Sequence, residues 1–427
     1  MRRSTIFLLI IFFLPGMFPQ AKAEVDLSNI TIYRDNFGVP HIHAKTDEEL
    51  AYGLAWATAE DDFGSIQENV LAVRGRLAEV QGKKGAIMDF IAFAMGFNEQ
   101  VEREFETQTS PEFRSVMQAY VDAINRYAEL HPKEVKLRKL FPVTSKDLMA
   151  GYMLGMAFIA NAQEPLTQIF SGSIKLHETN LPKGSNAIAI SPNKSADGGT
   201  YVAINSHQPL VGPYSWYEAH LINDKVNMHG ATFPGGMSLF VGANEHFAWA
   251  HTVNHPDFND VYKLEMHPED ELKYKYDGQW KTLKKRTKKI KVKVWIFKIR
   301  AKRTFYWSEY GPTIKTDDGF YSVRLPSMFE MSSAEQWHKM NRATDWESFR
   351  ATLDMQGHCG TNLIYGDKEG HIYYISNGLF PIRDTSFNWQ KVLPGNTSKT
   401  KWERNYYPID SLLQVFDPPS GYLYNSN

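Results

Sequence analysis

The periodicity of the chain changes at Gly184-Ser185-Asn186, and this change constrains the fold more than any other feature of the sequence. Before it, residues 48–164 carry apolar side chains largely at helical spacing, most regularly over 113–130. After it, Ala187-Ile188-Ala189-Ile190 alternates small and large apolar residues, as a half-buried strand does. Further short segments of β-type composition lie at 25–44, 201–204, 238–241 and 363–365. We therefore expect a helical first half and a strand-rich second half.

Ser185 is a candidate nucleophile if the peptide bond before it is cleaved. An N-terminal serine has an α-amine with a pKa of about 8, which suits proton abstraction from a hydroxyl near neutral pH. Gly184 has no Cβ, so the backbone there can strain and let the Ser185 hydroxyl attack the preceding carbonyl in an N-to-O acyl shift. Gly-Ser-Asn is also typical of a plain turn before a strand, and the tripeptide alone leaves both interpretations open.

The first 23 residues are typical of a signal peptide, with Arg2-Arg3, an apolar run from Ile6 to Phe13 and the cleavage motif Ala21-Lys22-Ala23. We expect a mature protein that starts at Glu24 and is periplasmic or secreted. No later run reaches the roughly 18 apolar residues of a membrane span. Because Cys359 is the only cysteine, the chain forms no internal disulfide.

The 427 residues carry a net charge of −1, which argues against a nucleic-acid partner and against a polybasic membrane partner. The most basic segment is 273–303, where apolar residues and lysines alternate. We interpret it as an exposed β-ribbon whose lysines protect its edge. A nucleic-acid surface is the alternative, but the rest of the sequence offers no matching basic face.

Several motifs follow one another along the chain in a fixed order. They are Arg34-Asp35-Asn36-Phe37-Gly38-Val39-Pro40-His41-Ile42, Ala59-Glu60-Asp61-Asp62-Phe63, Gly75-Arg76-Leu77-Ala78-Glu79, Gly184-Ser185-Asn186, His207, Phe233-Pro234-Gly235-Gly236, His251-Thr252-Val253, Gly360-Thr361-Asn362 and Pro381-Ile382-Arg383. As an ordered set they resemble the penicillin amidase family of N-terminal-nucleophile hydrolases. Within that family they are similar to the acylases that cut acyl-homoserine lactones and lipopeptides.

The resemblance implies an α+β fold, a four-layer αββα sandwich with a helical lobe from the N-terminal half. It also implies a division of the chain after the signal peptide of residues 1–23. Residues 24–170 would form a mostly helical α-chain, 171–184 a linker that ends at the cut, and 185–427 a β-chain. The two self-processed chains would form a heterodimer.

The resemblance further assigns roles to individual residues. Ser185 would be the nucleophile, its freed α-amine the base, and His207 the residue that orients this amine. The backbone N–H of Val253 and the side-chain amide of Asn362 would form the oxyanion hole. Arg383 would support Asn362 and the amine, unless it forms only a surface salt bridge.

A calcium site and a substrate pocket are weaker expectations. Asp257, Asn259 and Asp260 match the family's calcium loop, with Glu164 as a partner from the helical half, and oxygen ligands suit this cation. Two aspartates in a loop can equally be solvated. Met156 and Phe158 are candidates for the acyl pocket or for plain helix core. The chemistry requires no redox or organic cofactor.

The implied activity is hydrolysis of the linear amide bond of a small N-acyl substrate, such as an acyl-homoserine lactone, a fatty-acyl amide or a penicillin side chain. Family members continue past the point where this sequence stops, so we expect the β-chain to be incomplete at its C-terminus. The alternative is an inactive exported homologue that binds its ligand without turnover or needs a second polypeptide.

Two other hydrolase classes have partial support. His251, His255, Asp257 and Asp260 could bind a catalytic metal, but Pro256 disfavours the helix that the His-x-x-x-His spacing requires. Ser191-Pro192-Asn193-Lys194 and Ser398-Lys399-Thr400-Lys401 fit the S-x-x-K motif of penicillin-binding enzymes. The S-D-N and K-T-G elements of that class do not accompany them.

Overall fold

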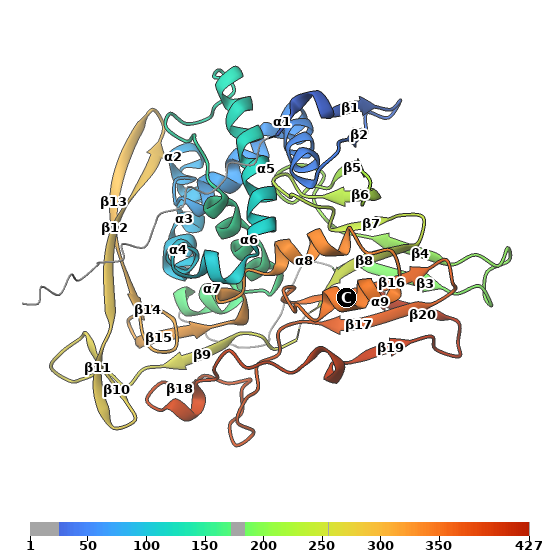
Figure 1. The fold of residues 1–427 in the computed structure, drawn as a ribbon. Coiled ribbons are helices and arrows are strands. Elements are labelled where there is room, and N and C mark those ends of the chain that lie inside the picture. The colour runs from blue at the N-terminus through green and yellow to red at the C-terminus, as the bar shows by residue number, and fades with distance from the viewer. Residues whose placement is uncertain (1–24, 172–183, 255, 427) are drawn as a thin grey trace, which may run out of the picture.

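The computed structural model describes residues 25–171, 184–254 and 256–426, with helices concentrated in the first half and strands in the second (Figure 1). The helical spacing over 113–130 corresponds to a single helix, α5, so that prediction is confirmed. The described helices are α1 (Asp47–Val73), α2 (Ala78–Gln81), α3 (Lys83–Met95), α4 (Phe97–Gln108), α5 (Pro111–Leu130), α6 (Ser145–Ile159), α7 (Gln163–Ser171), α8 (Ser333–Met340) and α9 (Trp346–Leu353).

Side-chain caps fix where the long helices begin. Thr46 starts α1 and Thr144 starts α6, each in a capping box with an acidic residue three positions later. Ser110 caps α5, and Pro111 follows at the first helical position, where its missing N–H costs no hydrogen bond. None of the described helices combines the length and the hydropathy that a membrane span requires.

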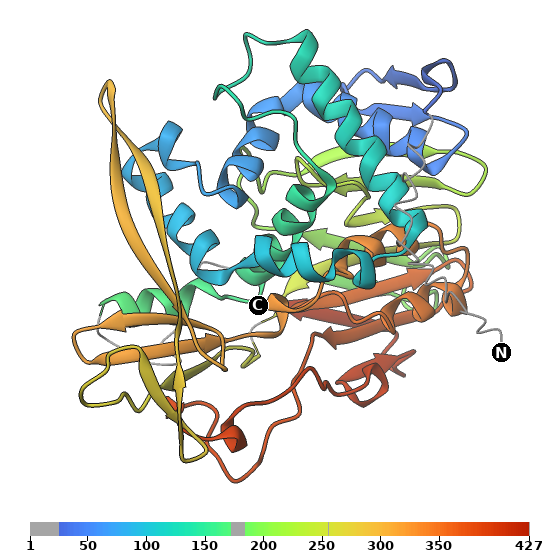
Figure 2. The ribbon, with the colours of Figure 1, turned by 60° about the vertical axis from the view of Figure 1, so that its left-hand side comes forward.

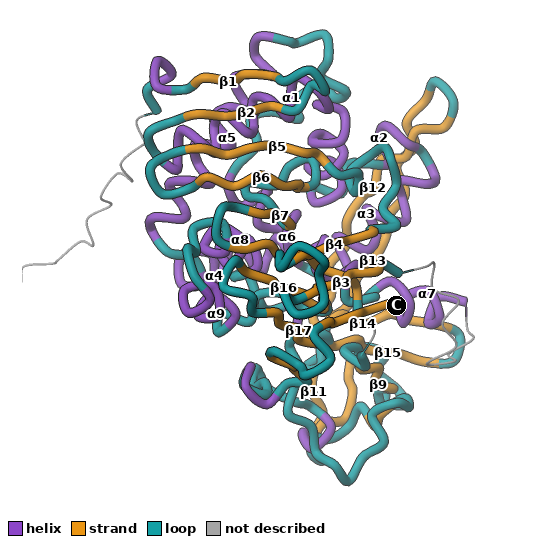
Figure 3. The backbone as a smooth tube through the Cα atoms, turned by 90° about the vertical axis from the view of Figure 1, so that its right-hand side faces the viewer, coloured by secondary structure: helices purple, strands orange, loops and turns teal. Residues whose placement is uncertain are grey.

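A nine-stranded sheet forms the centre of the molecule, in the order β1-β2-β5-β6-β7-β8-β16-β17-β19 (Figure 3). All neighbouring strands are antiparallel except the parallel pair β2 and β5. Their bounds are β1 (Thr31–Arg34), β2 (Pro40–His43), β5 (Tyr217–Ile222), β6 (Asn227–Thr232), β7 (Val241–Ala243), β8 (Phe247–Val253), β16 (Thr361–Asp367), β17 (Ile372–Asn377) and β19 (Gln414–Phe416). The sheet thus brings β8 and β16 side by side, although they are about a quarter of the chain apart, with Val253 opposite Thr361.

A three-stranded sheet, in the order β20-β3-β4, packs on one face of β8, β16 and β17. Its strands are β3 (Asn186–Ile190), β4 (Tyr201–Asn205) and β20 (Tyr422–Ser426). The strand predicted from the alternation of small and large residues at 187–190 is confirmed as β3, and its small residues face the large sheet. Ala187 and Ala189 point inward and form a core with Ala250 and Ile364 of the large sheet.

The main helices cover the opposite face of the large sheet, and α1, α5, α6 and α8 share one continuous apolar core with its strands (Figures 1 and 3). The α+β class is therefore confirmed, with a helical layer, a large sheet and a small sheet. The outer face of the small sheet carries the exposed side chains of Tyr201, Tyr422 and Tyr424, so no described helix covers it. The second helical layer of the expected αββα sandwich is not among the described elements.

A third sheet extends from the other side of the body, in the order β12-β13-β14-β15-β9-β18. Its strands are β9 (Asp260–Lys263), β12 (Lys284–Val294), β13 (Phe297–Trp307), β14 (Pro312–Thr316), β15 (Gly319–Arg324) and β18 (Leu393–Pro394), and a hairpin of β10 (Lys273–Tyr276) and β11 (Gln279–Thr282) lies beside it. The long pair β12 and β13 projects along the helical lobe (Figures 1 and 2). The exposed β-ribbon expected in this segment is confirmed.

The strand predicted at 238–241 is wrong for most of its length, because only Val241 belongs to a strand. The backbone of Leu239 is buried and bonds instead to the side chain of Asn341 in the segment after α8. Leu239 N–H donates to Asn341 Oδ1 at 2.9 Å, and Asn341 Nδ2 donates to the Leu239 carbonyl at 2.8 Å. A side-chain amide thus replaces a strand neighbour.

Removing this amide should destabilise the protein. Asn341→Ala leaves a buried backbone N–H and a buried carbonyl of Leu239 without their partners, which costs about 2–4 kcal/mol of unfolding free energy. Urea denaturation followed by circular dichroism measures this loss. Asn388→Ala, at an exposed position, is the control and should stay within about 0.5 kcal/mol of wild type. Equal effects of the two substitutions would contradict the role given to Asn341.

Candidate active site

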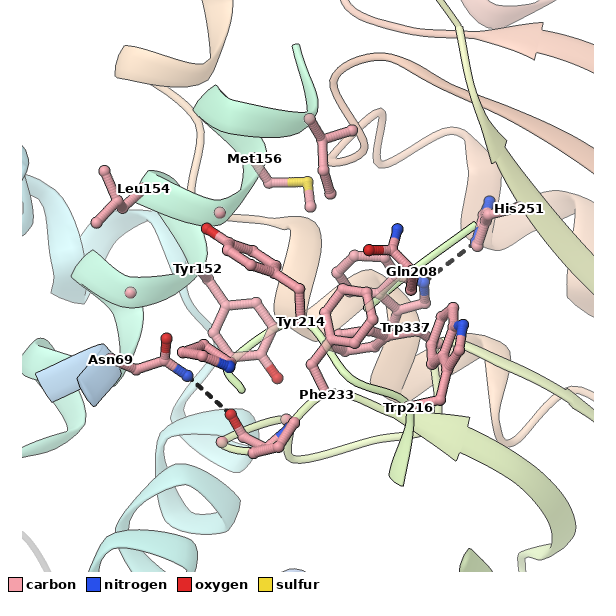
Figure 4. Close-up of a pocket in the computed structure, with 18 of the residues that line it drawn as sticks. Asn69, Tyr152, Leu154, Met156, Gln208, Tyr214, Trp216, Phe233, His251 and Trp337 are labelled. Carbon is pink, nitrogen blue, oxygen red and sulfur yellow. Dashed lines mark hydrogen bonds between the residues drawn. The ribbon is translucent and has the colours of Figure 1, made fainter. Parts of the chain in front are cut away.

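An apolar cavity of about 140 Å³ lies where α1 and α6 meet the ends of β3 and β8 (Figure 4). Its wall is rich in aromatic side chains, which come from four separate segments of the chain. These are Tyr152, Tyr214, Trp216, Phe233, Phe240 and Trp337. Aliphatic residues of α1 and α6 also line the cavity, and polar side chains such as Asn69, Ser206 and Gln208 join them. The largely apolar wall suits an apolar acyl group.

The aromatic rings support one another. Phe240 stacks on Trp337 with ring centroids 4.1 Å apart, and Phe233 meets Phe240 edge to face at 5.4 Å. Trp216 lies 4.5 Å from Phe233 and donates from its indole Nε1 to Ser206 Oγ. Such contacts hold the wall of the cavity in one arrangement.

The turn Phe233-Pro234-Gly235-Gly236 forms one side of the cavity and requires its glycines. Gly235 has a φ of +100°, a conformation that favours glycine. A Cβ on Gly236 would lie 1.9 Å from Thr232 Oγ1. Asn69 of α1 holds the turn from the opposite side, since its Nδ2 donates to the Pro234 carbonyl at 2.8 Å.

Ser185 lies at the edge of this cavity, one residue before β3 begins. It is 5% exposed, and Thr252, Val253 and Thr361 line the cavity with it. Of the residues predicted for the site, the structure therefore brings Ser185, Val253 and Met156 to one cavity. Phe158 packs against the core, half-buried, and is not among the lining residues.

Asn362 lies between the two sheets, beside the cavity rather than in its wall. Its Nδ2 donates to Thr252 Oγ1 at 3.0 Å and to Asn425 Oδ1 at 3.4 Å. Its Oδ1 accepts from the Tyr374 hydroxyl at 3.0 Å. The amide hydrogens of Asn362 thus have partners in this structure, and Thr252 connects Asn362 to the cavity.

His207 follows β4 with an exposed side chain and is not among the lining residues. Its Nε2 lies 3.4 Å from Asn205 Nδ2. The residues on either side of it, Ser206 and Gln208, line the cavity instead. In an extended segment neighbouring side chains point to opposite sides, so His207 points away from the cavity.

Arg383 forms ion pairs with both aspartates of the expected calcium loop. Its guanidinium lies 2.9 Å from Asp260 Oδ2 and 3.4 Å from Asp257 Oδ2. Asp260 is fully buried, and burial raises its pKa to about 7 although Arg383 and a hydrogen bond from Trp402 act in the opposite direction. Arg383 therefore pairs with the loop expected to bind calcium, and no described hydrogen bond joins it to Asn362.

The other residues expected to bind calcium make contacts of their own in this structure. Glu164 accepts from Asn161 and Gln168, and the Asn259 side chain donates to the carbonyls of Ala160 and Asn161, so neither turns to the aspartates. Two buried side-chain oxygens, Asp260 Oδ1 and Asn259 Oδ1, have no described protein partner. Over the described part of the chain, no three His, Cys, Asp or Glu side chains cluster as metal ligands.

The ion pairs of Arg383 predict how stability responds to a chelator. EDTA should leave the thermal midpoint unchanged, whereas Arg383→Gln should cost about 3–5 kcal/mol because it removes the cationic partner of the buried Asp260 carboxyl. Differential scanning fluorimetry measures both effects. Arg126→Gln, which removes an exposed ion pair with Glu129, is the control and should cost less than about 1 kcal/mol. A midpoint that falls in EDTA and recovers with calcium would contradict this assignment.

His251 of β8 joins the cavity wall to the neighbouring strand. The indole Nε1 of Trp337 donates to His251 Nε2 at 3.1 Å (Figure 4), so Nε2 carries no proton and the proton lies on Nδ1. Nδ1 in turn lies 3.3 Å from the Asn362 carbonyl and donates to it. Burial lowers the pKa of His251 to about 4, and burial also holds the pKa of the neighbouring His358 well below its usual range.

These two histidines should make the protein less stable in mild acid. Unfolding exposes them, so the unfolded state binds more protons than the folded state between a pH of about 6.5 and about 4. Stability is highest above this window and falls as pH decreases through it, by up to about 1.4 kcal/mol per pH unit for each histidine. Urea titrations at several pH values measure the slope.

Substitutions separate this effect from general acid denaturation. The double variant His251→Gln/His358→Gln should flatten the slope, whereas His43→Gln, at an exposed histidine, should not change it. An unchanged slope in the double variant would contradict the assignment of neutral buried imidazoles.

The sites of the rival hydrolase classes are not assembled. His251 lies in a strand and bonds to Trp337, away from Asp257 and Asp260, and His255 lies outside the described residues. Ser191 donates to Asn193 and to the Gly421 carbonyl. Neither Ser191 nor Ser398 is among the residues that line the cavity.

The sequence did not identify Ser206, Gln208 and Trp337 as residues of the site. It gave His251 and Thr252 only as part of a motif, and His251 as a ligand of the rival metal site. Strand alternation continued past β4 would have placed Ser206 and Gln208 on the inner face with Ile204. No comparable sequence pattern identifies Trp337, because only the packing of α8 against the core brings it to the cavity.

A family model for penicillin amidase matches residues 29–427. The chain belongs to the penicillin amidase family, as the ordered motifs predict.

The relatives of the chain are acylases. The acyl-homoserine lactone acylase PvdQ of Pseudomonas fluorescens is 26% identical over 401 residues, which cover 84% of this chain and 52% of that protein. The penicillin G acylase of Escherichia coli is 22% identical over 527 residues, which cover 95% of this chain and 60% of that enzyme. The chain spans about half the length of the curated relatives it matches.

The likeness extends to the fold. The solved structure of the thermostable penicillin G acylase from Alcaligenes faecalis, in its orthorhombic form, is 24% identical and superimposes with a TM-score of 0.50. The match covers 56% of this chain and 43% of that chain.

Proposed function

We propose that the chain is an exported acylase that hydrolyses the linear amide bond of an N-acyl substrate through an acyl-enzyme on Ser185. The observation that carries this proposal is the position of Ser185, behind Gly184 and at the edge of an apolar, aromatic-walled cavity. Membership of the penicillin amidase family and the acylase names of the relatives support it. Suitable substrates are acyl-homoserine lactones, fatty-acyl amides and penicillins with an apolar side chain.

The first step is self-cleavage. The Ser185 hydroxyl attacks the Gly184 carbonyl carbon, the amide nitrogen of Ser185 leaves as an amine, and water then hydrolyses the resulting ester. This gives a chain that ends at Gly184 and a chain that starts at Ser185, which stay together as a heterodimer. The helix α6 of the first chain lines the cavity together with Ser185 and the strand β8 of the second, so the site needs both chains.

Turnover uses the same hydroxyl. The freed α-amine accepts the proton of Ser185, whose oxygen attacks the amide carbonyl of the substrate, and the proton passes to the leaving amine. Water then attacks the acyl-enzyme and releases the carboxylic acid. The N–H of Val253, which lies at the cavity, and the amide of Asn362 would stabilise the oxyanion. His207 would turn toward the amine after processing.

For Asn362 this role requires a change of partner. Its Nδ2 donates to Thr252 and Asn425 before cleavage, and a shift of the residues around Ser185 would free one of these hydrogens for the substrate oxygen. Each such donor contributes about 3 kcal/mol to transition-state stabilisation in comparable sites.

A second candidate function is ligand binding without turnover. The exposed side chain of His207 and the occupied amide hydrogens of Asn362 favour it, because both residues would have to move before they could act. In that case the apolar cavity would hold an acyl group and the chain would stay uncleaved.

Intact mass spectrometry and a panel of chromogenic acyl amides distinguish the two. We expect the masses of two chains, one that ends at Gly184 and one that starts at Ser185. We also expect release of the chromophore from at least one phenylacetyl or fatty-acyl amide. Ser185→Ala should abolish both, because it removes the nucleophile of both steps. Asn362→Ala should lower kcat by roughly a hundredfold or more.

Ser191→Ala is the matched control, since Ser191 is equally buried near β3 but does not line the cavity. It should be processed and active like wild type. A single uncleaved species that binds acyl amides without hydrolysing them would replace the acylase proposal by the binding function.

A further inference from the structure

The β12–β13 ribbon has no role in the proposed acylase site, and it carries a dense group of cationic side chains with large exposed apolar residues at its turn. Between Lys284 and Trp307 the sequence has eleven Lys and Arg and no Asp or Glu. The two strands pair over eleven residues each and project from the body at one side (Figures 1 and 2). The net charge of −1 for the whole chain hides this local excess.

The pairing register sorts the side chains of the ribbon onto two faces. Apolar residues occupy one face, with Val292 opposite Ile299 and Val294 opposite Phe297. Cations occupy the other face and oppose one another directly. These pairs are Lys289 with Lys302, Lys291 with Arg300, and Lys293 with Lys298. Like charges in directly opposite positions repel, and an anionic partner would relieve this repulsion.

Packing against the helical lobe uses only part of the apolar face. Ile290 and Val292 are buried against Ala78 and Ala94 of the lobe. Beyond them the apolar residues are in solvent, and Trp295, Ile296 and Phe297 at the turn are 78%, 70% and 63% exposed. Trp295 has a φ of +54°, which is unfavourable for a bulky residue. A contiguous group of large apolar side chains in solvent is typical of an interaction site.

Further cations flank the turn from neighbouring segments. A Cβ on Gly82 would lie 2.8 Å from the Lys293 carbonyl, so the start of α3, with the exposed Lys83 and Lys84, lies beside the end of the ribbon. A cleft between the ribbon and the segment 137–139 is lined by Arg76, Arg138, Lys139, Lys291 and Lys298, with Leu137 and one carboxylate, Glu79. Arg76 and Lys298 both pair with Glu79, which neutralises it.

We propose that the outer end of the ribbon, Val294 to Phe297, docks on the surface of a lipid bilayer that contains anionic lipids. The aromatic and aliphatic side chains of the turn would enter the boundary between headgroups and acyl chains, where tryptophan is favoured. The surrounding lysines and arginines would contact the lipid phosphates and extend their own alkyl stems toward the apolar region. An apolar tip within a ring of cations is complementary to such a surface.

Other partners match this surface less well. A nucleic acid would engage the cations but leave the three largest apolar side chains of the turn in water. A second copy of the chain would bring two strongly cationic ribbons together, which repel. The proposal does not depend on whether the chain hydrolyses amides.

Co-sedimentation of the full chain with vesicles tests the proposal. We expect binding to vesicles of phosphatidylcholine and phosphatidylglycerol in equal parts, little binding to phosphatidylcholine alone, and weaker binding at high salt. Lys291→Glu/Lys293→Glu should lower the partition coefficient by about 25-fold or more, at roughly fivefold for each lysine removed. Trp295→Ser/Phe297→Ser should abolish the binding that remains at high salt.

Matched controls exclude general effects of charge and hydrophobicity. Phe37→Ser removes an aromatic ring that is 92% exposed at another turn, and Lys225→Glu/Lys399→Glu makes the same change of charge elsewhere. All four variants alter exposed residues, and circular dichroism verifies that they fold. Brominated lipids should quench tryptophan fluorescence in wild type and less in Trp295→Phe.

Three results would overturn the proposal. The first is the absence of binding to the anionic vesicles, and the second is an equal loss of binding in the control variants. The third is binding to duplex DNA but not to vesicles, unaffected by Trp295→Ser/Phe297→Ser, which would assign the ribbon to nucleic acid.

Discussion

Ala187 and Ala189 of β3 pack against Ala250 and Ile364 of the large sheet, and the candidate site depends on this contact between two sheets. Small side chains on β3 let the three-stranded sheet approach β8 and β16 closely. Because Ser185 immediately precedes β3, the same contact brings its hydroxyl to the ends of β8 and β16, where Thr252, Val253 and Thr361 line the cavity. Larger residues at 187 or 189 would push the candidate nucleophile away from its surroundings.

The polar groups around this contact form a connected set. Asn362, Thr252, Asn425 and Tyr374 bond to one another between the sheets. His251 adds a bond from β8 to the Asn362 carbonyl and holds Trp337 in the aromatic wall. A displacement of Asn362 would therefore shift the side chains of the cavity wall. The expected oxyanion-hole residue is in this way coupled to the shape of the acyl pocket.

Local periodicity was sufficient to predict parts of the fold, namely α5, β3 and the exposed ribbon, because those elements follow from spacing within one segment. It failed at 238–241, where a distant side chain, Asn341, replaces a strand neighbour. The site was harder to predict than the fold, because its residues come from segments that are far apart in the sequence. Arg383 pairs with Asp257 and Asp260 across more than a hundred residues, and a single sequence carries no sign of that pairing. The order of the motifs located Ser185 but also singled out His207, whereas its neighbours Ser206 and Gln208 line the cavity.

The central claim is that Ser185 carries the acyl group during turnover, and trapping the acyl-enzyme tests it most directly. The full chain would be mixed with an activated fatty-acyl or phenylacetyl ester, quenched in acid within the first turnover and digested for tandem mass spectrometry. We expect an added acyl mass on the peptide that begins at Ser185, located on the serine oxygen. Acylation of any other residue, or of none while the ester is consumed, would contradict it.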